Sequence, residues 1–165
     1  MAEITLEIKK GSVLDEVNKQ TAYVGAKITM DDGTNAYDKI YATSDDNAML
    51  ERFWKEAVAF TTGNLKMYLK SYIIGVATPF DPKPETVSTN DVLTITLTMP
   101  TRYDVAQTLS VNASLYSYFV NYMTARWMAL TNKPEAEYYE KYASTSMNDI
   151  LKKIFSKTKP VRPTT

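Results

Sequence analysis

The sequence predicts a mainly α-helical protein with a small antiparallel β element, an α+β fold organised as a helical bundle with a C-terminal αα-hairpin. Apolar residues recur at every third or fourth position, most clearly in residues 105–131, which is the spacing of a helix with a buried stripe. Residues 91–100 instead alternate Leu, Ile and Met with polar residues, as in a strand buried on one face. We expect a single domain at residues 1–156 with a β insertion at about residues 73–100, and then an extended basic tail at residues 157–165.

The first elements should be a strand and a helix. Residues 3–8 alternate polar and apolar side chains, which indicates a short strand or an extended arm. The apolar spacing then predicts a helix at about residues 13–24. Ser12 is placed to cap the start of this helix, and Gly25 is placed to end it.

A turn signal follows in residues 26–42. Asp32 and Gly33 are a residue pair that favours tight turns. The turn either joins residues 27–30 to residues 36–41 as a β-hairpin or lies in a long loop.

A long helix is predicted at about residues 45–72, capped by Ser44. Gly63 lies in the middle of it, where glycine costs about 1 kcal/mol relative to alanine. We therefore expect a kink or a close helix contact at Gly63. Residues 78–91 contain three prolines and no apolar rhythm, which indicates a long loop.

The strand at residues 91–100 needs a partner, because a lone strand leaves its backbone groups unpaired. Residues 72–77 and residues 3–8 are both candidates, and a neighbouring subunit is a third. After the helix at residues 105–131, Pro134 fits the first turn of another helix. The short connection makes these two helices an antiparallel αα-hairpin.

The helix at residues 105–131 is apolar on more than one face. Its main stripe consists of Leu109, Ala113, Tyr116, Val120, Met123, Trp127 and Leu130. We expect the αα-hairpin to cover this stripe and a second subunit to cover the adjoining face of Leu115, Phe119 and Tyr122. The expected subunit-interface residues are Leu115, Phe119, Tyr122 and Arg126 on this helix, and Lys159, Val161 and Arg162 in the tail.

The composition excludes several kinds of chemistry. The 165 residues include no cysteine and no histidine, which removes disulfides, cysteine metal sites and the commonest general base. Nineteen basic and nineteen acidic residues give a formal net charge of zero, which does not indicate a general affinity for nucleic acid or membranes. The start of the chain does not resemble a signal peptide, and no apolar run is long enough to span a bilayer. We expect a soluble protein that folds in a cytoplasm.

Residues that could carry catalysis have simpler structural explanations. The acidic residues at turns and helix starts are Asp31, Asp32, Asp45, Asp46, Glu135 and Glu137. They lack the spacing of a calcium loop and an apolar setting that would separate two carboxyl pKa values. A serine–lysine dyad stays open as the basis of a histidine-free hydrolase. The aromatic residues of the αα-hairpin favour core and protein interface over base stacking. We expect no enzyme, no cofactor and no metal.

The tail at residues 157–165 is basic and contains two prolines, so it should be extended. It is either a frayed terminus or an arm that docks on an adjacent subunit.

The order of elements resembles a known class of proteins. A capped helix carries TAYVGAK (residues 21–27), an acidic S-D-D start precedes LERFWKEAVAF (residues 50–60), a proline-rich loop and a strand follow, and the αα-hairpin reads WMALTNKPEAEYYEKYA (residues 127–143) before the basic tail. This resembles the small structural proteins of tailed bacteriophages and prophages, most of all the head–tail connectors that form a ring below the portal. Connectors are often more purely helical, so the β segment leaves a tail-completion or other neck role open.

The resemblance implies a non-enzymatic virion protein of the neck, assembled in the host cytoplasm. It implies a homo-oligomeric ring that contacts portal and tail proteins, while DNA passes through the lumen without sequence recognition and no membrane is involved. The second apolar helix face, the strand at residues 91–100 and the tail could each be completed by a neighbouring subunit. A bacterial adaptor domain that binds a peptide or helix is the alternative.

Overall fold

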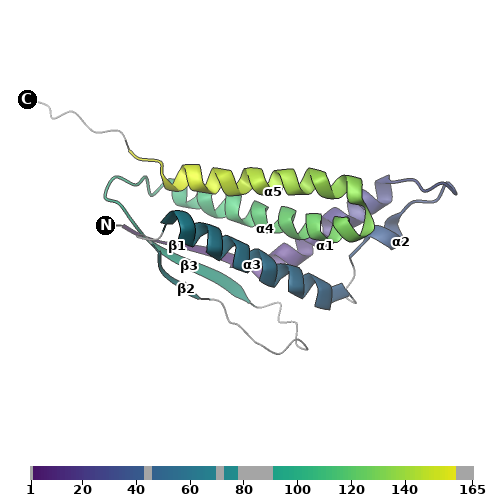
Figure 1. Ribbon diagram of the computed structural model, residues 1–165, viewed down its shortest axis with the longest axis horizontal. Helices are drawn as coiled ribbons and strands as arrows, with labels where there is room; N and C mark the ends of the chain where they lie inside the picture. Colours follow the sequence, from purple (N-terminus) through teal and green to yellow (C-terminus); the bar gives the residue numbers. More distant parts are fainter. Residues whose placement is uncertain (1, 43–45, 70–72, 78–90, 159–165) are drawn as a thin grey trace, which may run out of the picture.

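The computed structural model describes residues 2–42, 46–69, 73–77 and 91–158 of the 165-residue chain. Helices and a small antiparallel sheet pack together as a mainly α fold, which confirms the predicted fold class (Figure 1). The described elements are β1 (Ala2–Lys9), α1 (Lys10–Lys27), α2 (Tyr37–Ile40), α3 (Asn47–Leu69), β2 (Ile73–Ala77), β3 (Val92–Met99), α4 (Gln107–Thr131) and α5 (Lys133–Ile154).

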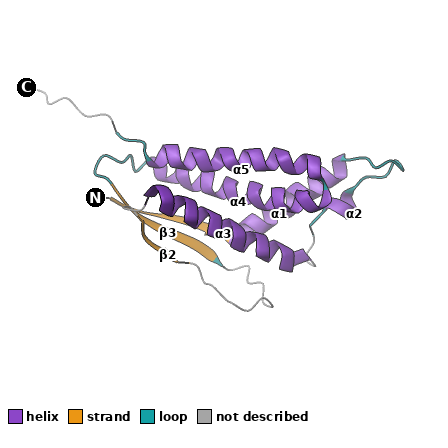
Figure 2. Cartoon of the chain, viewed as in Figure 1, coloured by secondary structure: helices purple, strands orange, loops and turns teal. Residues whose placement is uncertain are grey.

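The sheet has the strand order β1-β3-β2, and both pairings of β3 are antiparallel. Leu6 and Val76 both lie opposite Ile95, so the two strands that the sequence offers as partners flank β3 on its two sides. Of the three candidate partners, the two within the chain are confirmed, so β3 has no open edge for a strand from a neighbouring subunit. Figure 2 shows the sheet on one side of the helices.

Apolar and polar residues alternate along β3, so one face of the sheet packs into the core. Its four apolar side chains are buried and the residues between them are half-buried. The side chains of β1 that point to the same face are buried too, as expected from the period of two residues along a strand. These buried residues are Ile4, Leu6, Ile8, Leu93, Ile95, Leu97 and Met99.

The αα-hairpin of α4 and α5 confirms the predicted pair of helices. The apolar stripe of α5 is buried, with Ile150 fully inaccessible and Ala143 4% exposed. Lys153 Nζ donates to Ser114 Oγ at 2.7 Å and ties the two helices together. Two further contacts connect α4 to the start of the chain: Asn112 Oδ1 accepts a hydrogen bond from the Glu7 amide, and the Tyr116 hydroxyl donates to the Ser12 carbonyl.

The assignment of the two faces of α4 is right for the middle of the main stripe, where Val120, Met123 and Trp127 are buried, and wrong elsewhere. Leu115 and Phe119, expected at a subunit interface, are fully buried inside the chain. The Phe119 ring lies 4.9 Å from the Trp54 ring of α3, and the same core includes the sheet residues. Leu109 and Leu130, expected on the covered stripe, are 84% and 63% exposed. The reason is that the sheet and α3 cover the second face, which leaves the ends of the main stripe uncovered.

Helix α1 begins directly after β1, at a buried lysine. Lys10 is fully buried, forms an ion pair with Glu51 and lies 3.2 Å from the Asp91 carboxylate. These contacts join the strand–helix junction to α3 and to the start of β3. The predicted capping role of Ser12 is wrong, because the helix already begins at Lys10 without a side-chain cap.

Gly25 lies inside α1 rather than at its end. A Cβ atom at this position would lie 2.9 Å from the Cα of Tyr37, so glycine allows α2 to pack closely on α1. Gly63 in α3 differs, because a Cβ there would meet no atom within 4 Å. The close helix contact expected at Gly63 is therefore not present among the described residues.

The turn at Asp32 and Gly33 is confirmed. Gly33 has a φ of 80°, and the Met30 amide donates to the Thr34 carbonyl at 2.7 Å. Of the two alternatives, a short hairpin is present, because Thr29 and Asn35 pair in an antiparallel bridge, but its second side ends where residues 37–40 form α2. The Trp127 indole donates a 2.6 Å hydrogen bond to the Ile40 carbonyl and holds this short helix against α4.

Helix α3 (Asn47–Leu69) confirms the helix predicted at about residues 45–72 over the part that the structure describes. Ser44 and the last three residues of that prediction lie outside the described residues, as do most of the loop at residues 78–91 and residues 159–165 of the tail. The tail does begin within the described part. Thr158 exchanges backbone and side-chain hydrogen bonds with Arg102, and Lys157 forms a β-bridge with Tyr103.

Candidate protein-binding site

An open groove of about 880 Å³ runs between α3 and α5, with α4 as its floor. We call it the α3–α5 groove. Its lining consists of Glu56, Phe60 and Asn64 from α3, Tyr118, Tyr122, Ala125 and Arg126 from α4, and Glu140, Ala143, Ser144, Met147 and Asn148 from α5. It forms because α4 contacts both of the other helices while α3 and α5 stay apart above it.

Aromatic rings connect this groove to the core. The Phe60 and Tyr122 rings lie 5.8 Å apart, and Tyr122 lies 5.8 Å from Tyr118. Tyr118 meets the buried Phe119 ring edge-on at 5.8 Å. The floor is therefore held by ring contacts that continue into the packed interior, and it presents a preformed apolar surface.

One rim of the groove is polar and internally paired. Glu56 accepts from Arg52 at 3.1 Å and pairs with Arg126 at 3.2 Å. The Tyr122 hydroxyl points to the same carboxylate at 3.5 Å. The Glu56 carboxylate is therefore paired with two guanidinium groups. These contacts orient the side chains of Arg126 and Tyr122 at the rim of the groove.

The two tyrosine hydroxyls of the floor stay protonated far above neutral pH. Burial raises the pKa of Tyr118 to about 12, and the neighbouring Tyr122 adds to the effect. Burial also raises the pKa of Tyr122, with the negative charge of Glu56 as the second cause. Both residues therefore offer neutral hydroxyls and apolar ring surface to a bound segment.

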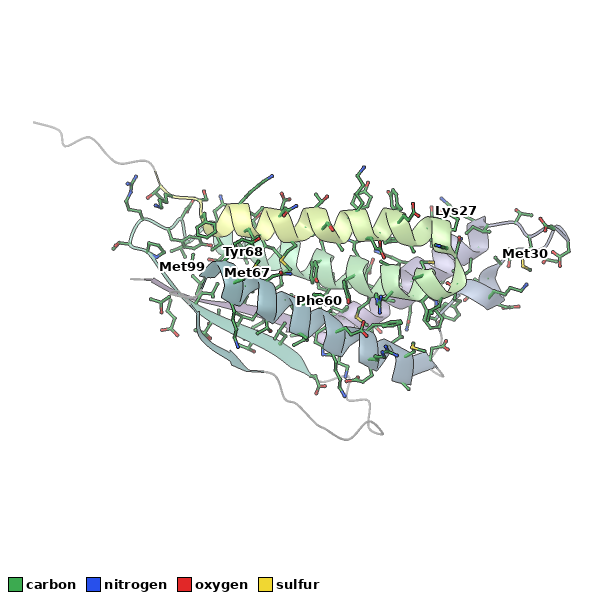
Figure 3. All side chains as sticks on the ribbon, viewed as in Figure 1. Lys27, Met30, Phe60, Met67, Tyr68 and Met99 are labelled. Carbon is green, nitrogen blue, oxygen red and sulfur yellow. The ribbon has the colours of Figure 1, made fainter. Side chains whose placement is uncertain are left out.

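The apolar surface continues along α3 beyond the groove. Phe60, Met67 and Tyr68 are 56%, 58% and 51% exposed, and Figure 3 labels all three on this helix. With Asn64 they occupy positions i, i+4, i+7 and i+8, which lie on one face of a helix. Exposed apolar side chains gathered on one face mark an interaction surface.

A second groove, of about 520 Å³, lies between α1 and α5. We call it the tyrosine groove. Its lining consists of Glu16, Lys19, Gln20 and Tyr23 from α1, Asn121 from α4, and Tyr138, Tyr139 and Tyr142 from α5. Tyr23, Tyr138 and Tyr142 are 63%, 54% and 46% exposed.

The tyrosines of α5 support one another. The Tyr138 hydroxyl donates to the Tyr142 hydroxyl at 3.2 Å, and their rings lie 4.6 Å apart. This hydrogen bond raises the pKa of Tyr138, while burial raises the pKa of Tyr139, and the charge of Glu135 adds to both shifts. Tyr138 also meets Tyr139 edge-on at 5.5 Å. The result is a fixed aromatic surface with neutral hydroxyls.

The expected interface residues divide into three groups. Leu115 and Phe119 belong to the core and do not reach any surface. Tyr122 and Arg126 come together in the α3–α5 groove. The three tail residues, Lys159, Val161 and Arg162, lie outside the described residues.

Sequence reasoning did not single out the exposed residues of α3 or the tyrosine groove. Tyr68 fits the three- and four-residue apolar spacing of α3, which favours a buried position, yet it is half exposed. Tyr23 and Tyr142 come together across more than a hundred residues of sequence. The crowding of tyrosines in α5 was the one available signal.

Two of the groups considered for catalysis make contacts that stabilise the fold. Asp32 accepts two hydrogen bonds from Thr34, which lower its pKa and close the turn. The candidate serine–lysine pair is Ser114 with Lys153, a contact between α4 and α5 that lines neither groove. Within the described ranges no three acidic side chains gather as a metal site would require, and no helix is long and apolar enough to cross a bilayer.

Comparison of the chain with protein-family models, with curated proteins and with solved structures gave no match. The function is therefore inferred from the residues and their geometry.

Proposed function

We propose that this chain is a non-enzymatic structural protein of a tailed-bacteriophage virion, a ring-forming head–tail connector or adaptor between portal and tail. In this role it assembles in the host cytoplasm and becomes part of the neck, and DNA passes through its ring without sequence recognition. The order of elements supports this proposal. The formal net charge of zero is compatible with a channel that does not retain DNA.

The α3–α5 groove with its exposed apolar residues is the observation that carries the proposal. Phe60, Met67 and Tyr68 keep apolar surface in water, and the groove beside them has a rigid aromatic floor. A groove of this form suits a helix or an extended segment of another protein. In a ring, that segment comes from the adjacent subunit, and its burial stabilises the assembly.

The test replaces Phe60 with a charged residue. Because Phe60 is more than half exposed, Phe60→Glu should change the free energy of unfolding by no more than about 0.5 kcal/mol. A carboxylate in the groove should abolish assembly of the full-length chain, measured by size-exclusion chromatography with light scattering. Ala59→Glu is the matched control, because Ala59 is exposed on the same helix and does not line the groove.

The proposal predicts oligomers for the unmodified chain and for Ala59→Glu, alone or after addition of the portal protein, and monomers for Phe60→Glu. Oligomers of equal size for all three proteins would contradict the role of the groove. A chain that stays monomeric at high concentration and in the presence of portal protein would contradict the connector function.

A bacterial adaptor domain is the second candidate, and the same groove favours it. An adaptor would bind a foreign peptide or helix in the α3–α5 groove without forming a ring. Portal and capsid genes next to the coding sequence would favour the virion role. Co-purification with tail proteins instead of the portal would favour a tail-completion or other neck protein.

A further inference from the structure

We propose that residues 159–165 of one copy of this chain bind in the tyrosine groove of a second copy, as an extended proline-rich segment. This inference rests on the proposed function in one respect only, namely that subunits associate. It assigns an occupant to the tyrosine groove, which is separate from the α3–α5 groove of the proposed function.

The chemistry of the tyrosine groove fits a proline-rich segment. Tyr23 lies on the α1 side, and Tyr138, Tyr139 and Tyr142 lie on the α5 side, so aromatic rings flank a channel from both walls. Proline rings pack well on aromatic faces, and an extended proline-rich backbone leaves its carbonyls free to accept hydrogen bonds. The Tyr142 hydroxyl accepts from Tyr138 and keeps its own proton to donate, and the Asn121 amide has a second proton beside the one that it donates to the Ser117 carbonyl.

The tail has the matching sequence. Residues 159–165 read KPVRPTT, in which Pro160 and Pro163 have the spacing of a P-x-x-P motif. Such a segment prefers the polyproline conformation, so little conformational entropy is lost when it binds. Val161 adds an apolar side chain between the prolines, and Lys159 and Arg162 add two positive charges.

The charges around the groove are mixed, with an acidic excess that favours a basic ligand. Glu16 lines the α1 wall and Glu135 acts electrostatically on the tyrosines of the α5 wall. Two cations are also present, because Lys19 lines the groove and Lys27 lies 4.2 Å above the Tyr23 ring. Asp15 precedes Glu16 and acts with it on Tyr116, which adds a further negative charge on this side. This balance favours the basic tail over the phosphate backbone of a nucleic acid.

The tail is too short to place both of its prolines in the groove of its own subunit, since Pro160 lies only two residues beyond Thr158. Thr158 is held at Arg102, in the loop that precedes α4, next to the end of α5. From Thr158 to Pro163 a polyproline segment spans about 16 Å. From Ile154 back to Tyr142 the helix alone spans about 18 Å, and Tyr138 lies a further turn away. A tail that fills the tyrosine groove therefore comes from another copy.

This contact joins two different surfaces, the tail of one subunit and the groove of the next. Such a head-to-tail contact repeats from copy to copy and closes into a ring when the rotation between subunits allows it. The hydrogen bonds at Arg102 fix where the tail leaves each subunit and so reduce the entropy lost on docking.

The experiment measures binding of a labelled peptide of residues 156–165 to the full-length chain by fluorescence anisotropy. The receptor carries Pro160→Ala and Pro163→Ala in its own tail, so that its groove is not already occupied. We expect saturable binding. Adding Tyr138→Ala and Tyr142→Ala to the receptor should weaken it about tenfold or more, since two aromatic contacts are lost.

Two controls locate the binding. Tyr68→Ala removes an equally exposed tyrosine from α3 and should leave the affinity unchanged. A peptide with both prolines replaced by alanine should bind at least several-fold more weakly. Circular dichroism melts of each receptor confirm that it is folded, and Tyr138→Phe/Tyr142→Phe, which keeps the rings, should retain most of the affinity.

Several results would overturn the inference. They are absence of peptide binding, binding that the tyrosine substitutions leave unchanged, binding lost with Phe60→Ala in the other groove, and binding of a single-stranded oligonucleotide in place of the peptide. Rings that form although the peptide does not bind would refute the inference and leave the proposed function standing. Peptide binding by a chain that never forms a ring would support the inference and contradict the proposed function.

Discussion

Phe119 shows how the core of this protein depends on residues far apart in sequence. Its ring is fully buried against Trp54 of α3, and the same core includes side chains of β1 and β3. The periodicity of α4 predicts correctly that this face is apolar. It does not tell which element covers the face, because that depends on where the sheet and α3 pack in three dimensions. The interface role expected for Phe119 was wrong for this reason.

Phe119→Ala should lower the free energy of unfolding by about 3–5 kcal/mol, because it leaves a cavity in a packed core. Leu109→Ala on the same helix should change it by no more than about 0.5 kcal/mol, because Leu109 is 84% exposed. Urea unfolding followed by circular dichroism measures both values. Equal small losses would show that Phe119 is not in the core.

The raised pKa of Tyr118 predicts that the free energy of unfolding changes with pH in the alkaline range. Its pKa is about 12 in the folded chain, mainly through burial, against about 10 for an unfolded tyrosine. Below pH 10 both states hold the proton and the residue has no effect. Between about pH 10 and 12 only the unfolded chain releases the proton, so the free energy of unfolding falls as pH rises. Tyr118→Phe should reduce this fall in urea titrations across that window, and an unchanged slope would contradict the assignment.

At the scale of elements, residue spacing predicts the buried face of a single strand or helix correctly. The alternation in β3 predicts its buried face, and the spacing in α5 predicts its stripe. The two grooves could not be predicted in this way, because residues from three helices line each of them. The start of α1 is another case. The apolar spacing predicts a start at about residue 13, yet α1 begins at Lys10, where Glu51 and Asp91 from elsewhere in the chain pair with the lysine.

Substitutions of Gly25 in α1 and Gly63 in α3 should have opposite effects on stability. A Cβ at Gly63 meets no atom within 4 Å, so Gly63→Ala should raise the free energy of unfolding by about 0.5–1 kcal/mol through helix propensity and a less disordered unfolded chain. Gly25→Ala should lower it, because the new methyl group would lie 2.9 Å from the Tyr37 Cα and push α2 from α1. Thermal unfolding of both variants decides this. A loss of stability in Gly63→Ala would mean that α3 makes a close contact there in an assembly.

At the scale of the whole molecule, two open grooves and an apolar face on α3 lie around a well-packed core. Of the aromatic residues of the αα-hairpin, Trp127 lies in the core as predicted, while Tyr138 and Tyr142 are exposed and their expected interface role stays a prediction. Which of them share a groove could not be derived from sequence, because α1 supplies the opposite wall. The proposed association would bury this exposed surface without any change in the core.

Native mass spectrometry of the full-length chain tests the central claim most directly. The account predicts one dominant closed assembly, alone or on the portal protein, whose mass is a whole-number multiple of the 18.7 kDa subunit. An 18.7 kDa monomer as the main species at every concentration, with and without the portal, would contradict it.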